Sequence, residues 1–203
     1  MRRELSPEEI REISGQVSAF FGSQDAVSVL LWFFQKTYQP ARGMSPEGLQ
    51  GIFTTQKFLS LKDVENLVLW KMDGQRNALV KELPTLRANG DRVKQVTSQI
   101  ASAIEAGDKP SALVSKACQL DGIALSIASA LLASWSDDYP IIDPRSWRTL
   151  SRITRHPYFA RFSTTDIDSY DAYVEILRTV AQRLRVKARQ LDKALFVLGR
   201  SRA

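Results

Sequence analysis

Cysteine and histidine are almost absent from this sequence. Its 203 residues include one cysteine, Cys118, and one histidine, His156. A single cysteine can neither close an intramolecular disulfide nor hold an iron–sulfur cluster. A single histidine argues against a histidine-based metal site and against a serine–histidine triad. We therefore expect a reduced, cytoplasmic protein without a cofactor, a metal or a disulfide-linked partner. Cys118 is predicted to be a small core residue, and His156 a surface residue at a helix end.

The sequence also lacks a long apolar run. The longest run, Ala26–Phe34, is interrupted by Ser28 and is much shorter than the roughly twenty residues of a membrane helix. The N-terminal Ser6-Pro7-Glu8 is typical of a capped helix rather than of a signal peptide. There is no glycine-rich loop of the kind that cradles nucleotide phosphates. The sequence thus predicts no membrane partner and no nucleotide-cofactor fold.

No segment alternates apolar and polar residues as a strand does, and every strong signal is helical. We predict a single compact, all-α unit, because 44% hydrophobic residues are typical of a globular chain. Ala26–Tyr38 is so apolar that we expect a helix buried on most sides. The other expected helices follow Ser6, Ser45 and Ser60, span 77–83, run from 91 to 106, lie within 113–119 and 125–135, cover 145–155, start at 163–166, and span 191–198.

Positive charge is concentrated in the last third of the chain. Residues 1–140 hold 15 Lys/Arg and 16 Asp/Glu, whereas residues 141–203 hold 13 and 6. Such a localised excess supplies sequence-independent attraction to nucleic-acid phosphates. The alternative is a solvated face that balances acidic helices, which is the commoner outcome for runs of charge.

The stretch Leu113–Leu150 carries the most chemical information. Its pattern predicts two short helices joined by a hairpin at Gly122. The second helix would present free backbone N–H groups to a phosphate. Asp143-Pro144 follows a buried-looking Ile141-Ile142 pair and is a strong helix-start signal.

These residues resemble the helix-hairpin-helix superfamily of DNA glycosylases, of the endonuclease III type. Leu120–Ala124 stands where the superfamily has its Leu-Pro-Gly-Val-Gly hairpin. Asp143 lies at the family's spacing after Gly122, and Trp147 and Arg148 match the positions that follow the catalytic aspartate. Two further segments, 61–71 and 191–196, extend the resemblance to prokaryotic relatives of these glycosylases whose activity is not established.

The resemblance implies a two-lobed helical fold without an iron–sulfur cluster. One lobe would be a helical barrel formed by residues 23–142, containing the hairpin 113–135, and the other would combine 1–22 with 143–203. It implies double-stranded DNA as partner and Asp143 as the carboxylate of a monofunctional glycosylase. Ser126 stands where strand-cleaving members carry a lysine. Asp121 and Ala124 replace the family's proline and second glycine, which favours a catalytically inactive relative that binds nucleic acid or protein.

Each candidate residue has a structural alternative. Asp143 is also an ordinary helix N-cap, and Gly122 an ordinary turn glycine. The arginine face formed by Arg145, Arg148, Arg152 and Arg155 either follows DNA or pairs with Asp166, Asp168 and Asp171. Aromatic residues in apolar runs are usually core, but Trp32 or Tyr38 is a candidate to stack on a flipped base. The predicted DNA contacts are Gly122, Ile123, Ala124, Ser126, Arg145, Arg148 and Arg152.

Overall fold

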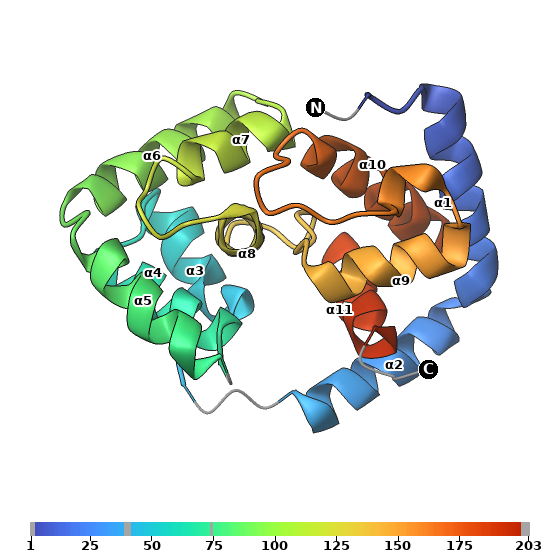
Figure 1. Ribbon diagram of the computed structural model, residues 1–203, viewed down its shortest axis with the longest axis horizontal. Coiled ribbons are helices and arrows are strands. Elements are labelled where there is room, and N and C mark those ends of the chain that lie inside the picture. Colours follow the sequence, from blue (N-terminus) through green and yellow to red (C-terminus); the bar gives the residue numbers. More distant parts are fainter. Residues whose placement is uncertain (1–2, 39–41, 74, 200–203) are drawn as a thin grey trace. The chain divides into compact units, whose positions relative to one another are not determined.

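The computed structural model describes residues 3–38, 42–73 and 75–199. These residues form eleven α-helices and one 3-10 turn and include no strand, which confirms the all-α prediction (Figure 1). The helices are α1 Pro7–Phe21, α2 Gln24–Thr37, α3 Pro46–Gln56, α4 Leu61–Lys71, α5 Arg76–Arg87, α6 Arg92–Glu105, α7 Pro110–Ala117, α8 Leu125–Ala133, α9 Pro144–Thr154, α10 Ser169–Leu184 and α11 Ala188–Leu198, with the 3-10 turn η1 Pro157–Phe159 after α9.

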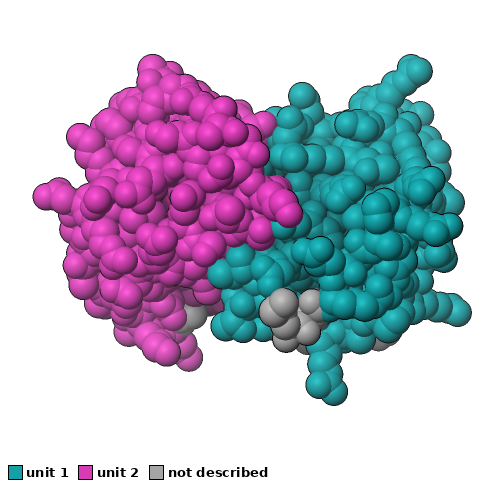
Figure 2. Space-filling view, turned by 90° about the horizontal axis from the view of Figure 1, so that it is seen from above, with its two compact units in different colours: residues 1–39, 137–203 teal, residues 40–136 magenta. Residues whose placement is uncertain are grey.

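The chain divides into two compact units, coloured separately in Figure 2. The first combines residues 1–39 with 137–203, and the second is the continuous segment 40–136. These boundaries lie later at the N-terminal junction and earlier at the C-terminal junction than the expected 22/23 and 142/143. The difference arises because α2 packs along α11 and therefore belongs with the terminal segments.

In the first unit, α11 is the shared partner of its neighbours. It packs against α2, α9 and α10, while α1 packs against α10 and α9. Figure 1 shows the blue N-terminal helices beside the orange and red C-terminal ones. The core between them includes Val17, Trp147, Tyr170, Tyr173 and Leu195, each at most 1% exposed. Burial of this apolar surface ties the two ends of the chain into one body.

In the second unit, α8 is the central helix. It contacts α3, α4 and α7, and every residue from Ile127 to Ala133 on it is buried. Its small side chains, Ala128 and Ala130 among them, let neighbouring helices approach closely. The hairpin predicted from the sequence is therefore the helix pair α7–α8, with α6 packed on α7.

The helix-start signals in the sequence form capping hydrogen bonds in the structure, as expected. Ser6 and Glu9 form a reciprocal capping box at α1, and Ser60 and Asp63 form another at α4. Four predicted boundaries are wrong by three residues or more. Helix α7 begins at Pro110 instead of Leu113, and α11 begins at Ala188 instead of Leu191. Helix α5 continues through Pro84 to Arg87, and α10 begins at Ser169 because residues 163–168 form turns instead of a first helical turn.

The prediction that α2 is buried on most sides is wrong. Only Val27 is buried, whereas Val29, Trp32 and Phe33 are 45–55% exposed. The helix packs against α11 and, less extensively, against α1, and these contacts leave its other apolar side chains half-buried or exposed. Within the described residues, no single helix has the length and apolarity to cross a membrane, although α1 and α2 meet that criterion together as a pair bent by 74°.

Candidate nucleic-acid and carboxylate site

Asp143 is held in one orientation at the start of α9. Its Oδ1 accepts hydrogen bonds from the backbone N–H groups of Arg145 at 2.8 Å and Ser146 at 2.9 Å. The side chain is 7% exposed. A carboxylate at a helix N-terminus is further stabilised by the helix dipole. The N-cap interpretation of Asp143 is therefore confirmed, and the cap also fixes where the negative charge lies.

Pro140 and Ile141, which lie three and two residues before Asp143, are held by buried side chains from α10 and α11. The Tyr170 hydroxyl donates to the Pro140 carbonyl oxygen at 2.9 Å, and the Tyr173 hydroxyl donates to that of Ile141 at 3.1 Å. Asp192 accepts from the Ile141 N–H. Three side chains thus fix the backbone that leads into Asp143.

Both tyrosines keep their protons. Burial raises the pKa of the Tyr170 and Tyr173 hydroxyls well above the ordinary value, and the charge of Asp192 adds to the effect. They consequently remain hydrogen-bond donors at neutral pH. Asp192 is itself paired with Arg189, and both side chains are almost completely buried. The sequence pattern did not identify this ion pair.

Trp147 closes the inner side of α9. Its ring lies 4.8 Å from that of Phe159 and 6.3 Å from that of Tyr173, with Tyr158 and Phe162 also in contact range. The indole is 1% exposed. The family-like Trp147 is thus a core residue that anchors the helix carrying Asp143.

The outer side of α9 carries the arginine face. Arg145, Arg148 and Arg152 are all exposed, and Arg155 follows at the C-cap with a positive φ of 52°. None of the four forms an ion pair with a described residue, so the alternative of pairing with the Asp166–Asp171 cluster is not seen there. The face is thus a strip of positive charge that no carboxylate of the described residues pairs with.

The hairpin turn is held against α5. Gly122 has a φ of +82°, and a side chain there would begin 3.1 Å from the Glu82 carbonyl oxygen and 3.3 Å from the Leu86 nitrogen. Asn89 donates to the Asp121 carbonyl oxygen and accepts from the Asp121 N–H, each at 3.0 Å. Two hydrogen bonds with the Asn89 side chain therefore hold the turn, a contact that the sequence pattern did not reveal.

The first turn of α8 leaves backbone donors available. The Ile123 N–H donates to the Leu120 carbonyl oxygen, and Ile123 is only 6% exposed. The prediction that Ile123 contacts a phosphate is therefore wrong. The N–H groups of Ala124, Leu125 and Ser126 have no acceptor among the described residues, but Leu125 is 0% exposed, so only Ala124 and Ser126 can offer an N–H to a phosphate. Ala124 is exposed and caps α8 without a side-chain bond. An anion is favoured at such a helix start. Asp121 is exposed at the preceding turn, where its negative charge opposes one.

Substitution of Gly122 tests how strictly the turn is specified. The change Gly122→Ala is expected to lower the free energy of unfolding by about 1–2 kcal/mol, because the added methyl group meets α5 and the left-handed backbone is strained. Urea denaturation measures this. Gly51→Ala is the matched control, since Gly51 lies in α3 with open space around it and alanine favours helix. Equal stability of both variants would contradict the turn geometry.

The two aromatic candidates for a base pocket, Trp32 and Tyr38, differ in exposure and in the rings that they contact. Trp32 is 53% exposed and contacts Phe33, with Lys36 6.0 Å above its ring. Tyr38 is half-buried against Phe34 and Phe196, at ring distances of 5.1 and 5.5 Å. Only Tyr38 therefore belongs to a multi-residue cluster, and Arg145 reaches the same cluster over Phe196.

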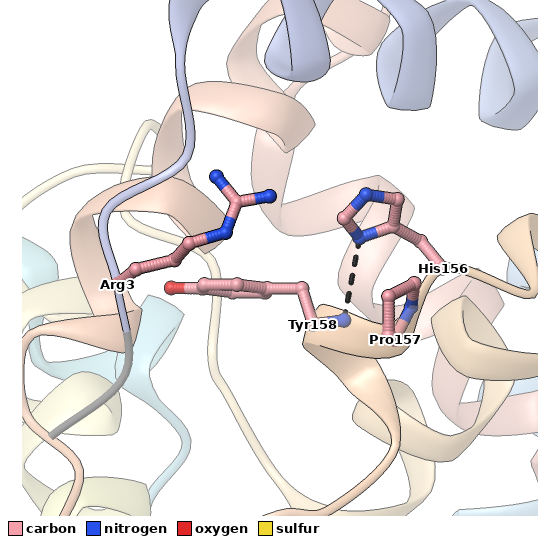
Figure 3. A pocket seen from close by; sticks show the side chains of 4 residues that line it. All are labelled: Arg3, His156, Pro157 and Tyr158. Carbon is pink, nitrogen blue, oxygen red and sulfur yellow. Dashed lines mark hydrogen bonds between the residues drawn. The ribbon is translucent and has the colours of Figure 1, made fainter.

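A pocket of about 240 Å³ lies elsewhere in the first unit, lined by Arg3, His156, Pro157 and Tyr158 (Figure 3). Two of its polar side chains, those of Arg3 and His156, have partners within the protein. Arg3 pairs with Glu9 and thereby holds the pKa of that carboxyl at about 2. His156 Nδ1 accepts from the Tyr158 N–H at 3.3 Å, so the histidine is a half-buried turn cap and not the expected surface residue.

The structure points to neither a reactive cysteine nor a metal site among the described residues. Cys118 is half-buried at the end of α7, and burial raises the pKa of its thiol to about 11. A thiol with this pKa is almost entirely protonated, and unreactive, at neutral pH. Among residues 3–38, 42–73 and 75–199, no three His, Cys, Asp or Glu side chains gather as metal ligands.

Comparison with known proteins gives no match to any family model, curated protein or solved structure.

Proposed function

We propose that this protein binds double-stranded DNA and acts as a monofunctional DNA glycosylase of the helix-hairpin-helix type, with Asp143 as its catalytic carboxylate. The observation that carries the proposal is the fixed orientation of Asp143. Its Oδ1 is held by two N–H groups at the start of α9, and buried side chains secure the backbone before it. Catalytic groups need this pre-organisation, because they must be in place before charge develops on the substrate.

The chemistry requires only one carboxylate and water. Cleavage of an N-glycosidic bond develops positive charge on the sugar, and a fixed negative charge beside it lowers the energy of that transition state. Asp143 would stabilise the cation, and water would then complete hydrolysis at the sugar carbon. The base leaves with the bonding electrons and takes up a proton. No amine nucleophile is involved, since Ser126 occupies the position expected for one.

DNA binding would use two surfaces, one in each unit. The arginine face supplies Arg145, Arg148 and Arg152 to the phosphate backbone, and the donors at the start of α8 supply a neutral anchor for one phosphate. The two-lobed arrangement of the glycosylase fold is part of this proposal.

An excision assay with paired variants tests the proposal. Duplexes carrying deaminated, oxidised or alkylated bases are incubated with protein, and abasic sites are revealed by alkali. Asp143→Asn removes the charge but keeps a good N-cap, because asparagine also accepts the two N–H bonds. We expect excision of at least one lesion by the wild type and a loss of more than about a hundredfold in this variant. Excision that persists unchanged in Asp143→Asn would contradict the assigned role.

A second candidate is a non-catalytic relative that binds nucleic acid or protein. The observation in its favour is that Asp143 is only 7% exposed and already serves as an N-cap. The negative charge of Asp121 at the hairpin also favours this candidate, because it opposes a phosphate there. In this case no lesion is excised, while duplex binding remains dependent on salt and on the arginine face.

A further inference from the structure

Three helices of the first unit bring aromatic rings and cations together at one place. Phe34 and Tyr38 come from the end of α2, Lys193 and Phe196 from α11, and Arg145 from the first turn of α9. Phe196 is central, with ring centroids 5.5 Å from Tyr38 and 6.0 Å from Phe34. We call these five residues the aromatic–cation cluster. Figure 1 shows the three helices that carry it.

The cations lie over the rings. The Arg145 guanidinium carbon is 4.9 Å from the Phe196 centroid, and the Lys193 Nζ is 5.5 Å from that of Phe34. Arg145 is exposed and forms no ion pair with a described residue. The contact with Phe196 orients the guanidinium while leaving its charge uncompensated.

The rings of the cluster differ from those of the core in the same unit. Trp147, Tyr170 and Tyr173 are at most 1% exposed, whereas Phe34, Tyr38 and Phe196 are each only half-buried. Their mutual contacts hold the rings in place at the surface. A fixed, partly exposed aromatic surface beside two cations is complementary to a ligand with flat apolar faces and negative charge.

We propose that the aromatic–cation cluster binds single-stranded nucleic acid. An unpaired base stacks on the exposed ring surface, and an adjacent phosphate contacts Arg145. Base–aromatic stacking is tolerant of sequence and, together with a positive groove, is the usual means of holding single strands. Bases within a duplex are already stacked and cannot reach the rings. The cluster is thus a second nucleic-acid site, independent of any excision by Asp143.

Fluorescence anisotropy with an oligothymidine of about 15 nucleotides and with a duplex of equal length tests this proposal. The variants Tyr38→Leu and Phe196→Leu keep an apolar side chain but remove the ring. Each is expected to weaken binding of the single strand by about 5–100-fold and to leave duplex binding nearly unchanged. Arg145→Gln should lower the salt dependence of single-strand binding by about 0.7 in the logarithmic slope.

Two controls separate this proposal from others. Trp32→Leu removes an aromatic side chain that is more exposed than the cluster rings and lies on the same helix, and it should leave single-strand binding unchanged. Asp143→Asn should bind the single strand like the wild type, whether or not glycosylase activity exists. The proposal is overturned if the wild type does not bind oligothymidine, if both leucine variants bind it like the wild type, or if Trp32→Leu weakens it equally. Circular dichroism checks that each variant is folded.

Discussion

Asp192→Asn is expected to lower the free energy of unfolding by about 3–5 kcal/mol, one of the two largest effects we predict. Asp192 is the buried partner of Arg189, and both side chains are at most 5% exposed. Removing the carboxylate charge takes away a buried counter-charge of the Arg189 guanidinium, which costs far more than an exposed pair contributes. Denaturation in urea, followed by circular dichroism, measures the change.

The exposed pair Lys57–Glu105 is the matched control for this experiment. Both of its side chains are 53% exposed, so Glu105→Gln should change the free energy of unfolding by less than about 1 kcal/mol. A double variant, Arg189→Met with Asp192→Leu, removes both buried charges and should recover much of the loss. If Asp192→Asn were as mild as Glu105→Gln, the buried ion pair would not support the segment before Asp143 as described.

Trp147→Ala is expected to be comparably severe, with a loss of about 3–5 kcal/mol. The indole is 1% exposed and contacts rings from η1 and α10, so alanine leaves a large cavity beneath α9. Thermal and urea unfolding measure the loss. Trp32→Ala removes the same side chain from a site that is 53% exposed and should change stability by less than about 0.5 kcal/mol. Similar losses in both variants would contradict the core assignment.

Signals that act over one helical turn were the ones that sequence predicted well. Ser6, Ser60 and Asp143 all cap helices as expected, because a cap depends on the side chain and the next three residues. The turn at Gly122 was predicted for the same reason. Where local signals were weak, boundaries shifted, as at the start of α10, where the residues 163–166 form turns instead of a cap.

Features that depend on distant partners were missed or misread. The apolar density of α2 predicted burial, but within the described residues the helix packs mainly on α11 and, less extensively, on α1, and Val27 is its only buried residue. In the sequence Asn89 has the pattern of a loop residue, and only the fold brings it into contact with Asp121, which is 32 positions away. The Arg189–Asp192 pair and its bond to Ile141 likewise require the fold, since helical spacing alone does not indicate burial.

The candidate site shows the same division. The sequence identified Asp143, the arginine face and Tyr38 individually, whereas Phe196 and Lys193 join them only through the packing of α11 between α2 and α9. The segment 191–196 contributed to the family resemblance, but nothing in it indicated contact with Tyr38 or Arg145. Gly199 supports this packing, because a side chain there would begin 2.7 Å from the Arg145 carbonyl oxygen.

Binding to a duplex that contains a cationic abasic-site analogue tests the catalytic role of Asp143 without any knowledge of the excised base. The analogue mimics the positive sugar of the transition state. If Asp143 is catalytic, the wild type should prefer it over the unmodified duplex by more than about tenfold, or 1.4 kcal/mol, at two salt concentrations. Asp143→Asn should abolish that preference while retaining salt-dependent duplex binding. Equal affinity of the wild type for both duplexes would contradict a catalytic Asp143, and no binding to either would contradict the DNA-binding proposal as well.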